Sequence, residues 1–299
     1  MMIDCVSLQK SVVDFLKNEI ANCKKVRKST PSLAIVLVGN NPASKVYVSR
    51  KTKLAEEIGI SCNLFHFEEN AKESDVLSQI ALLNEDENCH GIIVQLPLPS
   101  GFDKDKILFQ IAPTKDVDGL HPFNIGLLNY TNALPYSITN CDLSFQNRKL
   151  GENVPFIPCT PLGCLYVIQQ NTQTLAGKNV VIFGNSNLVG KPLSRILMLC
   201  GATVTTLHTK SVINEDIIQN ADIIVLATGV EITLPSHLKT NVIIVDVGIR
   251  LNNENKIIGD LNYSNINTHN ALITPVPNGI GRMTVASLVF NAFLAWKNK

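Results

Sequence analysis

The sequence lacks the features that mark several specialised classes of protein. Its 26 basic and 25 acidic side chains leave a net charge of only +1, so no strong positive field attracts nucleic acid or an anionic membrane. No apolar run approaches the roughly 20 residues that span a bilayer. These absences predict a protein that binds neither nucleic acid nor a membrane.

Paired cysteines are also missing. The eight cysteines are scattered, none forms a C-x-x-C pair, and Cys159 and Cys164, the closest two, have no histidine pair at metal spacing. We therefore expect free thiols in a reducing, cytoplasmic compartment, and no metal site. Charged residues interrupt the apolar positions of residues 1–20, which favours an amphipathic helix over a signal peptide.

What is present indicates a folded α/β protein. Hydrophobic residues make up 45% of the 299 positions and charged residues 17%, enough for two domains with cores of their own. Helical and strand patterns alternate, and apolar strands between helices predict parallel sheets covered on both faces. In the first half we expect helices near 8–21 and 74–83, and strands at 33–38, 60–67 and 91–95.

The second half repeats this alternation and resembles a Rossmann-type dinucleotide domain. The final helix is expected at 283–296, whereas the pattern breaks down between 127 and 156, which we interpret as a loop or surface insertion. The remaining expected elements are strands at 179–183, 203–207, 222–227 and 242–247, and a helix that follows the turn 184–192 and ends near 200–201.

Lys51 lies on a predicted helix after the strand 33–38, and Tyr47 shares its face. No helical neighbour of Lys51 is a carboxylate, whereas Lys53 has Glu56 and Glu57 at favourable spacings. Lys51 is thus expected against an apolar face, where partial desolvation suits proton transfer. Considered alone, this segment also fits a lysine whose aliphatic carbons lie along the apolar face while its ammonium group reaches water.

Gln95 occupies a second informative position, at the end of the strand 91–95, where prolines stiffen the chain. Loops at the C-terminal ends of parallel strands are the usual place for chemistry. The alternative is that Gln95 only caps the strand end. For Asp116 a turn or cap role is expected, and His121 and His208 are expected to be structural or peripheral.

Gly184 begins a candidate phosphate-binding turn. Its lack of a side chain suits a tight turn after a strand, and small Ser186 lets the backbone approach a pyrophosphate. The glycine pattern is incomplete, because Val189 stands at the last glycine position and Gly190 one place later. The next strand ends in 207–210 without a carboxylate, which favours NADP over NAD, although Lys210 fits a solvated loop lysine nearly as well.

Several motifs occur in a specific order along nearly the whole chain. They are Val38-Gly39 to Ile60, Val94 to Pro99, Lys115 to Gly119, Pro158 to Gly163, Gly184 to Pro192, Val245 to Ile249, Gly259-Asp260, and Thr274 to Thr284. Together they resemble the bifunctional methylenetetrahydrofolate dehydrogenase/cyclohydrolase family. The resemblance implies NADP-dependent oxidation of 5,10-methylenetetrahydrofolate to the methenyl cation, followed by hydrolysis to 10-formyltetrahydrofolate.

The resemblance also implies an architecture of two α/β domains. The expected domains are a folate-binding catalytic domain at 1–126, completed by a C-terminal helix at 281–299, an insertion or linker at 127–156, and a Rossmann-type NAD(P)-binding domain at 157–280. The active site is expected in the cleft between the domains. A homodimer formed through the Rossmann-like domain is expected as well.

Site residues follow from the same resemblance. Lys51 is expected to handle protons during hydrolysis, with Gln95 hydrogen-bonded to it, Tyr47 packed on the substrate and Asp118 bound to the pterin. Further substrate contacts are expected from Val94, Leu96, Pro277, Gly279 and Gly281. Cofactor contacts are expected from Gly184, Asn185, Ser186, Thr209 and Ile249.

The chain departs from the family pattern at four places. Asn185 stands where an arginine is frequent, which keeps NAD open as the cofactor; Asn278 and Arg282 replace a usual Gly and Pro; and Leu127 replaces a frequent Arg. The stretch 130–153 is longer than the usual connection. The alternatives are a cyclohydrolase with weak or NAD-dependent dehydrogenase activity, a catalytically silent folate- or nucleotide-binding regulator, and a Rossmann oxidoreductase of a small acid.

Overall fold

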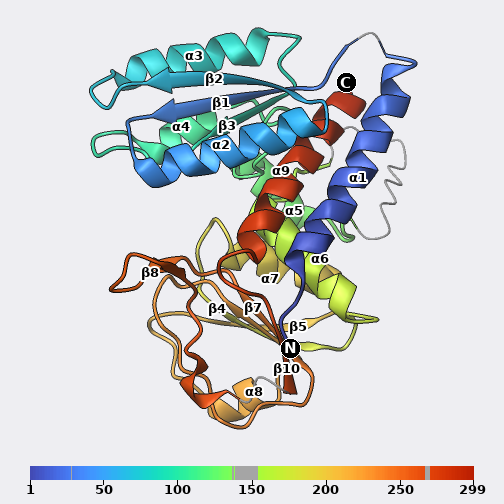
Figure 1. The fold of residues 1–299 in the computed structure, drawn as a ribbon, viewed down its shortest axis with the longest axis vertical. Helices are drawn as coiled ribbons and strands as arrows, with labels where there is room; N and C mark the ends of the chain where they lie inside the picture. The colour runs from blue at the N-terminus through green and yellow to red at the C-terminus, as the bar shows by residue number, and fades with distance from the viewer. Residues whose placement is uncertain (28, 137, 139–153, 267–269) are drawn as a thin grey trace. The chain divides into compact units, whose positions relative to one another are not determined.

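The computed structural model describes residues 1–27, 29–136, 138, 154–266 and 270–299 (Figure 1). Its helices are α1 Cys5–Lys24, α2 Pro42–Glu57, α3 Glu73–Glu85, α4 Lys104–Gln110, α5 Pro122–Tyr130, α6 Cys159–Asn171, α7 Gly190–Leu199, α8 Glu215–Gln219 and α9 Ile280–Lys297. Its strands are β1 Ser32–Val38, β2 Ser61–Phe67, β3 Gly91–Val94, β4 Asn179–Phe183, β5 Thr203–Leu207, β6 Ile223–Leu226, β7 Val242–Asp246, β8 Arg250–Leu251, β9 Ile257–Ile258 and β10 Ala271–Ile273.

The described residues divide into two compact units. The first unit contains Ser11–Tyr130, 154–159 and Val285–Lys299. The second unit contains Met1–Lys10, the described residues between 131 and 138, and Thr160–Thr284. Each unit holds one parallel sheet, so the predicted two-domain α/β fold is confirmed.

The sheet of the first unit has the order β2-β1-β3, with all pairs parallel. Alternate β1 residues face opposite sides of a sheet, and Ala34, Val36 and Val38 pack in one core with α3 and α4. Leu33 and Ile35 are fully buried on the other side, along which α2 runs (Figure 1). The central strand is therefore covered on both faces, as predicted.

β2 departs from that expectation, because none of its seven residues is fully buried and Leu64 is 52% exposed. It occupies the edge of a three-stranded sheet, where only one neighbouring strand shields it.

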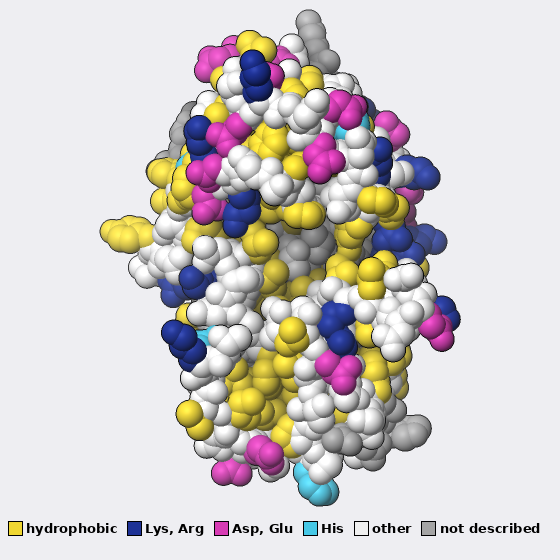
Figure 2. All heavy atoms as spheres, turned by 90° about the vertical axis from the view of Figure 1, so that its left-hand side faces the viewer, with side chains coloured by type: hydrophobic (Ala, Val, Ile, Leu, Met, Phe, Trp, Pro, Cys, Tyr) yellow, Lys and Arg dark blue, Asp and Glu magenta, His cyan; other side chains and the backbone are white. Residues whose placement is uncertain are grey.

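On the face shown in Figure 2, basic and acidic side chains are interspersed, in keeping with the small net charge.

The sheet of the second unit has the order β10-β7-β6-β4-β5 and is also parallel. Its strands β4, β6 and β7 are almost wholly buried, as their continuous apolar sequences predict. The bounds predicted for strands and helices of both halves agree with the structure to within three residues. The helices α4, α5, α6 and α8, the strand β10 and the hairpin β8–β9 were not predicted.

Both sheets reverse their strand order at their first strand. β1 has β2 on one side and β3 on the other, and β4 likewise lies between β5 and β6. Ligands of open parallel sheets bind at the carboxyl ends of the strands where the order reverses. The relevant strand ends are therefore those of β1 and β3 in the first unit, and those of β4 and β6 in the second.

The predicted insertion at 127–156 falls largely outside the described residues; its first part, to Tyr130, is the end of α5. Among the described helices, none has the length and apolar character needed to cross a membrane.

Candidate active site

Local sequence positions Lys51 at the reversal point of the first sheet. β1 ends at Val38, Gly39 turns the chain with a φ of +80°, and the Asn41 side chain caps α2 by accepting from Ser44 N over 3.1 Å. The buried residues of α2 are Ser44, Val48, Lys51 and Ala55. Their spacing of three or four residues defines one helix face, which points Lys51 into the unit.

Lys51 and Gln95 meet inside the first unit. Only 9% of Lys51 and 8% of Gln95 is exposed, and Nζ of the lysine donates to Oε1 of the glutamine over 3.0 Å. No ion pair among the described residues includes Lys51, whereas Lys53 on the same helix is exposed. The expected contrast between the two lysines, and the expected hydrogen bond, are both present.

Gln95 follows β3 directly. Its backbone N–H donates to Val36 O over 2.8 Å, which continues the sheet, and its side-chain Nε2 donates to Leu96 O. The side chain is thus held at both ends, and its amide oxygen is directed at Lys51. Capping of the strand end alone does not describe this arrangement.

Tyr47 lies one helical turn before Lys51 and is half-buried. Burial raises the pKa of its phenol, with a smaller opposing effect of Arg50, so the hydroxyl stays protonated at neutral pH. Val94 and Leu96 flank Gln95, but the Val94 side chain packs in the core with α3 and α4. Only the backbone of Val94 is therefore available to a ligand.

Asp118 is carried by a loop that two buried charges secure. The Lys115 ammonium donates to the carbonyls of Leu83, Asn84 and Asp86, each over 2.7 Å, at the end of α3. The next residue of the loop, Asp116, holds the turn that leads into α5. Its carboxylate accepts from Leu120 N, His121 N and Asn124 Nδ2.

The predicted turn or cap role of Asp116 is therefore confirmed, and burial raises the pKa of its carboxyl to about 6. His121 also belongs to this cap: its Nδ1 accepts from Phe123 N over 3.0 Å, and burial lowers the pKa of its ring. Its structural role is likewise as expected.

The loop is also fixed from α9. Asn291, which is fully buried, donates to Val117 O over 2.9 Å and to Ile157 O over 3.0 Å. Gly119 has a φ of +72°, and a Cβ there would lie 2.7 Å from Pro158 N. Asp118 is therefore presented by a loop with little freedom to move.

Cys159 was not predicted as part of this site. Its backbone N–H donates to Asp118 O over 3.2 Å, and its thiol donates to Val117 O. Burial raises the pKa of the thiol, the charge of Asp118 adds to that effect, and the charge of Lys51 opposes it. The pKa of the Cys159 thiol is therefore influenced by both Asp118 and Lys51, although these two residues are far apart in the sequence. The only sequence feature that pointed to Cys159 was its position within the motif Pro158 to Gly163.

The turn at Pro277–Gly281 lies in the second unit, immediately before and within the start of α9. Gly279 is required there, because a Cβ would lie 2.0 Å from Pro275 O. Asn278 has a φ of +76° and its Oδ1 accepts from Arg282 Nε over 3.0 Å. Arg282 Nη1 in turn donates to Gln9 Oε1 over 3.0 Å. The two unusual residues of this turn thus form a bonded pair.

Two glycines shape the turn after β4. Gly184 has a φ of +115°, and a Cβ there would lie 2.2 Å from Ala227 O at the end of β6. A Cβ on Gly190 would lie 2.0 Å from Gly184 O. Gly190 thus supplies the close packing of helix on turn, one place later than the usual fingerprint. Ser186 closes the turn by accepting at Oγ from Val189 N over 3.1 Å.

This turn forms one wall of a cavity of about 1390 Å³ in the second unit. Asn185 and Ser186 line it, as do Thr209 and Lys210 after β5. Ile249, the remaining predicted cofactor contact, does not line the cavity and is 52% exposed. His208 does line it, and its Nδ1 accepts from Lys210 N over 3.1 Å.

The cavity suits a dinucleotide. It opens at the reversal point of the sheet, the glycine turn lines it, and no carboxylate stands at the end of β5. Among the described residues, no group of three or more His, Cys, Asp or Glu side chains could hold a metal ion.

Comparisons with known proteins match both halves of the chain. Residues 3–118 match the family model of the tetrahydrofolate dehydrogenase/cyclohydrolase catalytic domain, and residues 158–299 match the model of its NAD(P)-binding domain. The bifunctional protein FolD of Rickettsia bellii is 43% identical over 297 residues, which cover 99% of this chain and 98% of that protein.

Solved structures agree with these matches. The bifunctional FolD methylenetetrahydrofolate dehydrogenase/cyclohydrolase of Campylobacter jejuni is 38% identical, with a TM-score of 0.87 over 100% of this chain and 99% of the other. The Trypanosoma brucei FolD structure, which is complexed with NADP and an inhibitor, is 28% identical, with a TM-score of 0.84 over 99% and 97% of the two chains.

Proposed function

The chain belongs to the tetrahydrofolate dehydrogenase/cyclohydrolase family, and we propose that it oxidises 5,10-methylenetetrahydrofolate with NADP and hydrolyses the product to 10-formyltetrahydrofolate. The observation that carries this proposal is the buried hydrogen bond between Lys51 and Gln95 at the reversal point of the first sheet. The dinucleotide-sized cavity of the second unit supports it independently.

The oxidation needs positioning more than acid–base chemistry. A neighbouring nitrogen lone pair expels the hydride from the methylene bridge, so no side chain has to remove a proton. Bound NADP⁺ would accept that hydride. The chain's part is to hold the reactants, which we assign to Gly184, Asn185, Ser186 and Thr209 for the nucleotide. Ile249 stays a proposed nucleotide contact on the resemblance alone.

The hydrolysis needs proton management, which we assign to Lys51. Water adds to the methenyl carbon of a cationic substrate, and one proton leaves in the net reaction. A cation beside the lysine favours the neutral amine, which then accepts a proton from the attacking water. Gln95 orients the amine through its amide oxygen without adding a charge that would hold the lysine protonated.

Substrate binding is assigned to other groups of the chain. A carboxylate accepts two N–H bonds from the donor edge of a pterin, which suits Asp118, and Tyr47 offers a ring to pack on the substrate. Further contacts are proposed for the backbone of Val94, for Leu96, and for the turn residues Pro277, Gly279 and Gly281. The rigid mounting of Asp118 supports its role, because a preorganised acceptor costs less to order on binding.

NADP is the proposed cofactor. The end of β5 presents Thr209 and Lys210 to the cavity, and a hydroxyl with a cation suits a ribose phosphate better than a carboxylate would. Asn185, where the family often has an arginine, favours the alternative of a cyclohydrolase whose dehydrogenase step is weak or uses NAD.

We also propose that the catalytic domain comprises residues 1–126 and 281–299, that the NAD(P)-binding domain comprises residues 157–280, and that residues 127–156 are an insertion between them. A cytoplasmic location and the absence of nucleic-acid partners are proposed as well. Finally, we propose a homodimer formed through the Rossmann-type domain. Light scattering on the purified chain tests the dimer. A mass of 32.7 kDa at micromolar concentration would refute it.

The function is tested by following methenyltetrahydrofolate spectroscopically. We expect the purified chain to form it from methylenetetrahydrofolate with NADP, more slowly with NAD, and to consume added methenyltetrahydrofolate without any nucleotide. Absence of methenyl formation with both nucleotides would refute the dehydrogenase assignment. Unaccelerated methenyl decay would refute the cyclohydrolase assignment.

A further inference from the structure

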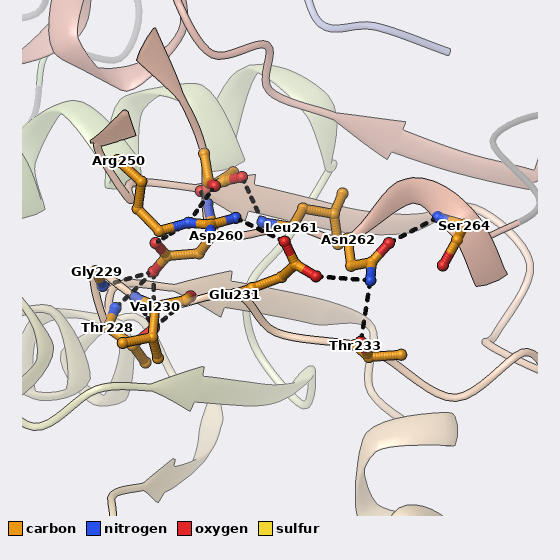
Figure 3. Close-up of polar contacts among 12 residues, drawn as sticks. Thr228, Gly229, Val230, Glu231, Thr233, Arg250, Asp260, Leu261, Asn262 and Ser264 are labelled. Carbon is orange, nitrogen blue, oxygen red and sulfur yellow. Dashed lines mark hydrogen bonds and ion pairs between the residues drawn. The ribbon is translucent and has the colours of Figure 1, made fainter. Parts of the chain in front are cut away.

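Asp260 is a fully buried carboxylate of the second unit that does not line the cavity. Its Oδ2 accepts three hydrogen bonds from the segment after β6: from Thr228 N over 2.7 Å, Thr228 Oγ1 over 2.8 Å and Gly229 N over 2.9 Å (Figure 3). Thr228 does line the cavity. The Asp260 carboxylate thus accepts three hydrogen bonds from a loop that forms part of the cavity wall.

The neighbouring residues extend this attachment. Ile232 N donates to Asp260 O over 2.7 Å, and Asn262 N donates to Ile232 O over 2.9 Å. The Asn262 side chain donates to Glu231 Oε1 over 2.9 Å and to Thr233 Oγ1 over 3.3 Å (Figure 3). The segment 260–262 therefore holds the wall 228–233 along its whole length.

A second buried carboxylate fixes Asp260 itself. Asp246, at the end of β7, accepts from Asp260 N over 3.0 Å, Leu261 N over 2.9 Å and Gly248 N over 3.0 Å. A Cβ on Gly248 would lie 2.0 Å from Asp260 Oδ1, and one on Gly259 would lie 2.0 Å from Asp246 Oδ2. Each carboxylate therefore occupies the space that a glycine of the other strand end leaves open.

Charge explains why an ionised group is retained at this place. A buried carboxylate is costly unless its oxygens are compensated, and hydrogen bonds to a charged acceptor are stronger than those to a neutral one. Three donors compensate Oδ2, whereas Oδ1 has no hydrogen-bond partner among the described residues. Arg250 supplies a cation there, with Nε 3.9 Å from Asp260 Oδ1 and 2.9 Å from Gly259 O. Its Nη2 also reaches Glu231 Oε2 over 3.3 Å. The cluster joins four segments at one end of the sheet.

We propose that Asp260 is a positioning residue for the nucleotide site, which holds the wall 228–233 in the shape that binds the cofactor. This inference rests on the proposed function, because it assigns the cavity to NADP. It also gives a role to the motifs Val245 to Ile249 and Gly259-Asp260, whose glycines and carboxylates build the cluster.

Asp260→Asn is the main test, and Asp222→Asn is its matched control. Asp222 precedes β6 at the opposite end from Thr228, where it accepts from Asn179 N over 2.9 Å and pairs with Lys239. Both substitutions remove one carboxylate charge from the same unit. Only the first weakens the anchor of the cavity wall.

Calorimetric titration with NADP measures the binding directly, without catalysis. We expect Asp260→Asn to raise the dissociation constant roughly tenfold, since three charge-assisted bonds become neutral ones, and Asp222→Asn to leave it within about twofold. In the dehydrogenase assay, Asp260→Asn should raise KM for NADP and leave kcat largely unchanged. Hydrolysis of methenyltetrahydrofolate without nucleotide should not change.

Equal NADP affinity in Asp260→Asn and the unaltered chain would overturn the inference, as would equal weakening by Asp222→Asn. If Asp260→Asn does not fold, Asn262→Ala tests the same wall through Glu231 and Thr233, with an expected weakening of roughly threefold. Unchanged affinity in that variant would then overturn the inference. An unaltered chain that binds NADP but forms no methenyl product would instead refute the proposed function.

Discussion

Nζ of Lys51 lies 3.0 Å from Oε1 of Gln95, and more than nine-tenths of each side chain is buried. A lysine in such a position usually has a carboxylate partner, because a buried charge is costly without one. Here the partner is a neutral amide. The amide oxygen fixes the position of the amine without placing a negative charge beside it.

Replacement of Lys51 by methionine should abolish methenyl hydrolysis, because the methionine side chain is similar in length to lysine but has no amine. Folate binding should remain, since Asp118 and its loop are unaffected. Spectroscopic decay of methenyltetrahydrofolate measures the first effect, and equilibrium binding of tetrahydrofolate the second. Lys53→Met is the control, because Lys53 is exposed on the same helix. Comparable hydrolysis in the two variants would rule out the role of Lys51.

Gln95→Glu changes the partner of Lys51 to a carboxylate of the same shape. The new charge stabilises the ammonium form, so the amine is available only at higher pH. We expect hydrolysis at neutral pH to fall about tenfold or more and its pH profile to move upward. A Gln95→Glu profile that coincides with that of the unaltered chain would contradict the orientation proposed here.

Gly184→Ala should remove NADP binding. The added Cβ lies 2.2 Å from the backbone oxygen of Ala227, and the φ of +115° is strained for alanine, so the turn has to move. Calorimetric titration with NADP measures the loss. Gly126→Ala serves as the control, because a Cβ there meets nothing within 4 Å. Retained affinity in Gly184→Ala would show that the cofactor binds elsewhere.

The bond between Asn278 and Arg282 should matter for folate and not for NADP. Arg282→Met removes the donor at 3.0 Å from Asn278 Oδ1, and Asn278→Gly removes the acceptor while tolerating the φ of +76°. Each should raise KM for methylenetetrahydrofolate about threefold. Arg282→Met also breaks the bond to Gln9, so the double variant should be no worse than Arg282→Met alone. Fully additive effects would mean that the two residues act separately.

His90 should limit stability in acid. Its ring is buried with an Nδ1 that has no hydrogen-bond partner among the described residues, and burial lowers its pKa from 6.5 to about 4, helped by the charges of Lys299 and Lys115. Between those values the unfolded chain binds a proton that the folded chain does not. The free energy of unfolding therefore falls as the pH drops from about 6.5 through about 4.

His90→Gln should reduce that fall, because glutamine does not titrate. Urea unfolding at pH 7 and pH 5 measures the difference, and His237→Gln, at an exposed histidine, is the control. An equally steep fall in His90→Gln and the unaltered chain would assign the acid sensitivity to other groups.

The predictions from sequence succeeded where a local pattern carried the information. Apolar runs located β1, β4 and β7, and helical spacing distinguished Lys51 from Lys53. β2 was placed correctly but predicted to be buried, because a sequence does not reveal which strand lies at the edge of a sheet. The short strand β10 gave too few residues for a period to be seen.

Long-range contacts account for what the sequence could not reveal. Asn291 holds the Asp118 loop from 174 residues away, and Asp260 reaches Thr228 from 32 residues away. Neither residue type signals such a role, since isolated asparagine and aspartate are common in turns. Gly248 and Gly259 were recognised as parts of motifs, but the carboxylates that require them became visible only in three dimensions.

The last helix has a consequence for the synthesis of the chain. Phe290, Phe293 and Trp296 of α9 are fully buried, and the guanidinium of Arg27 lies over the Trp296 ring at 5.5 Å, all within the first unit. Although that unit begins at residue 11, its core stays open until α9 has left the ribosome. The usual order, in which the N-terminal domain folds first, is therefore closed to this protein, and the growing chain exposes apolar surface that chaperones recognise.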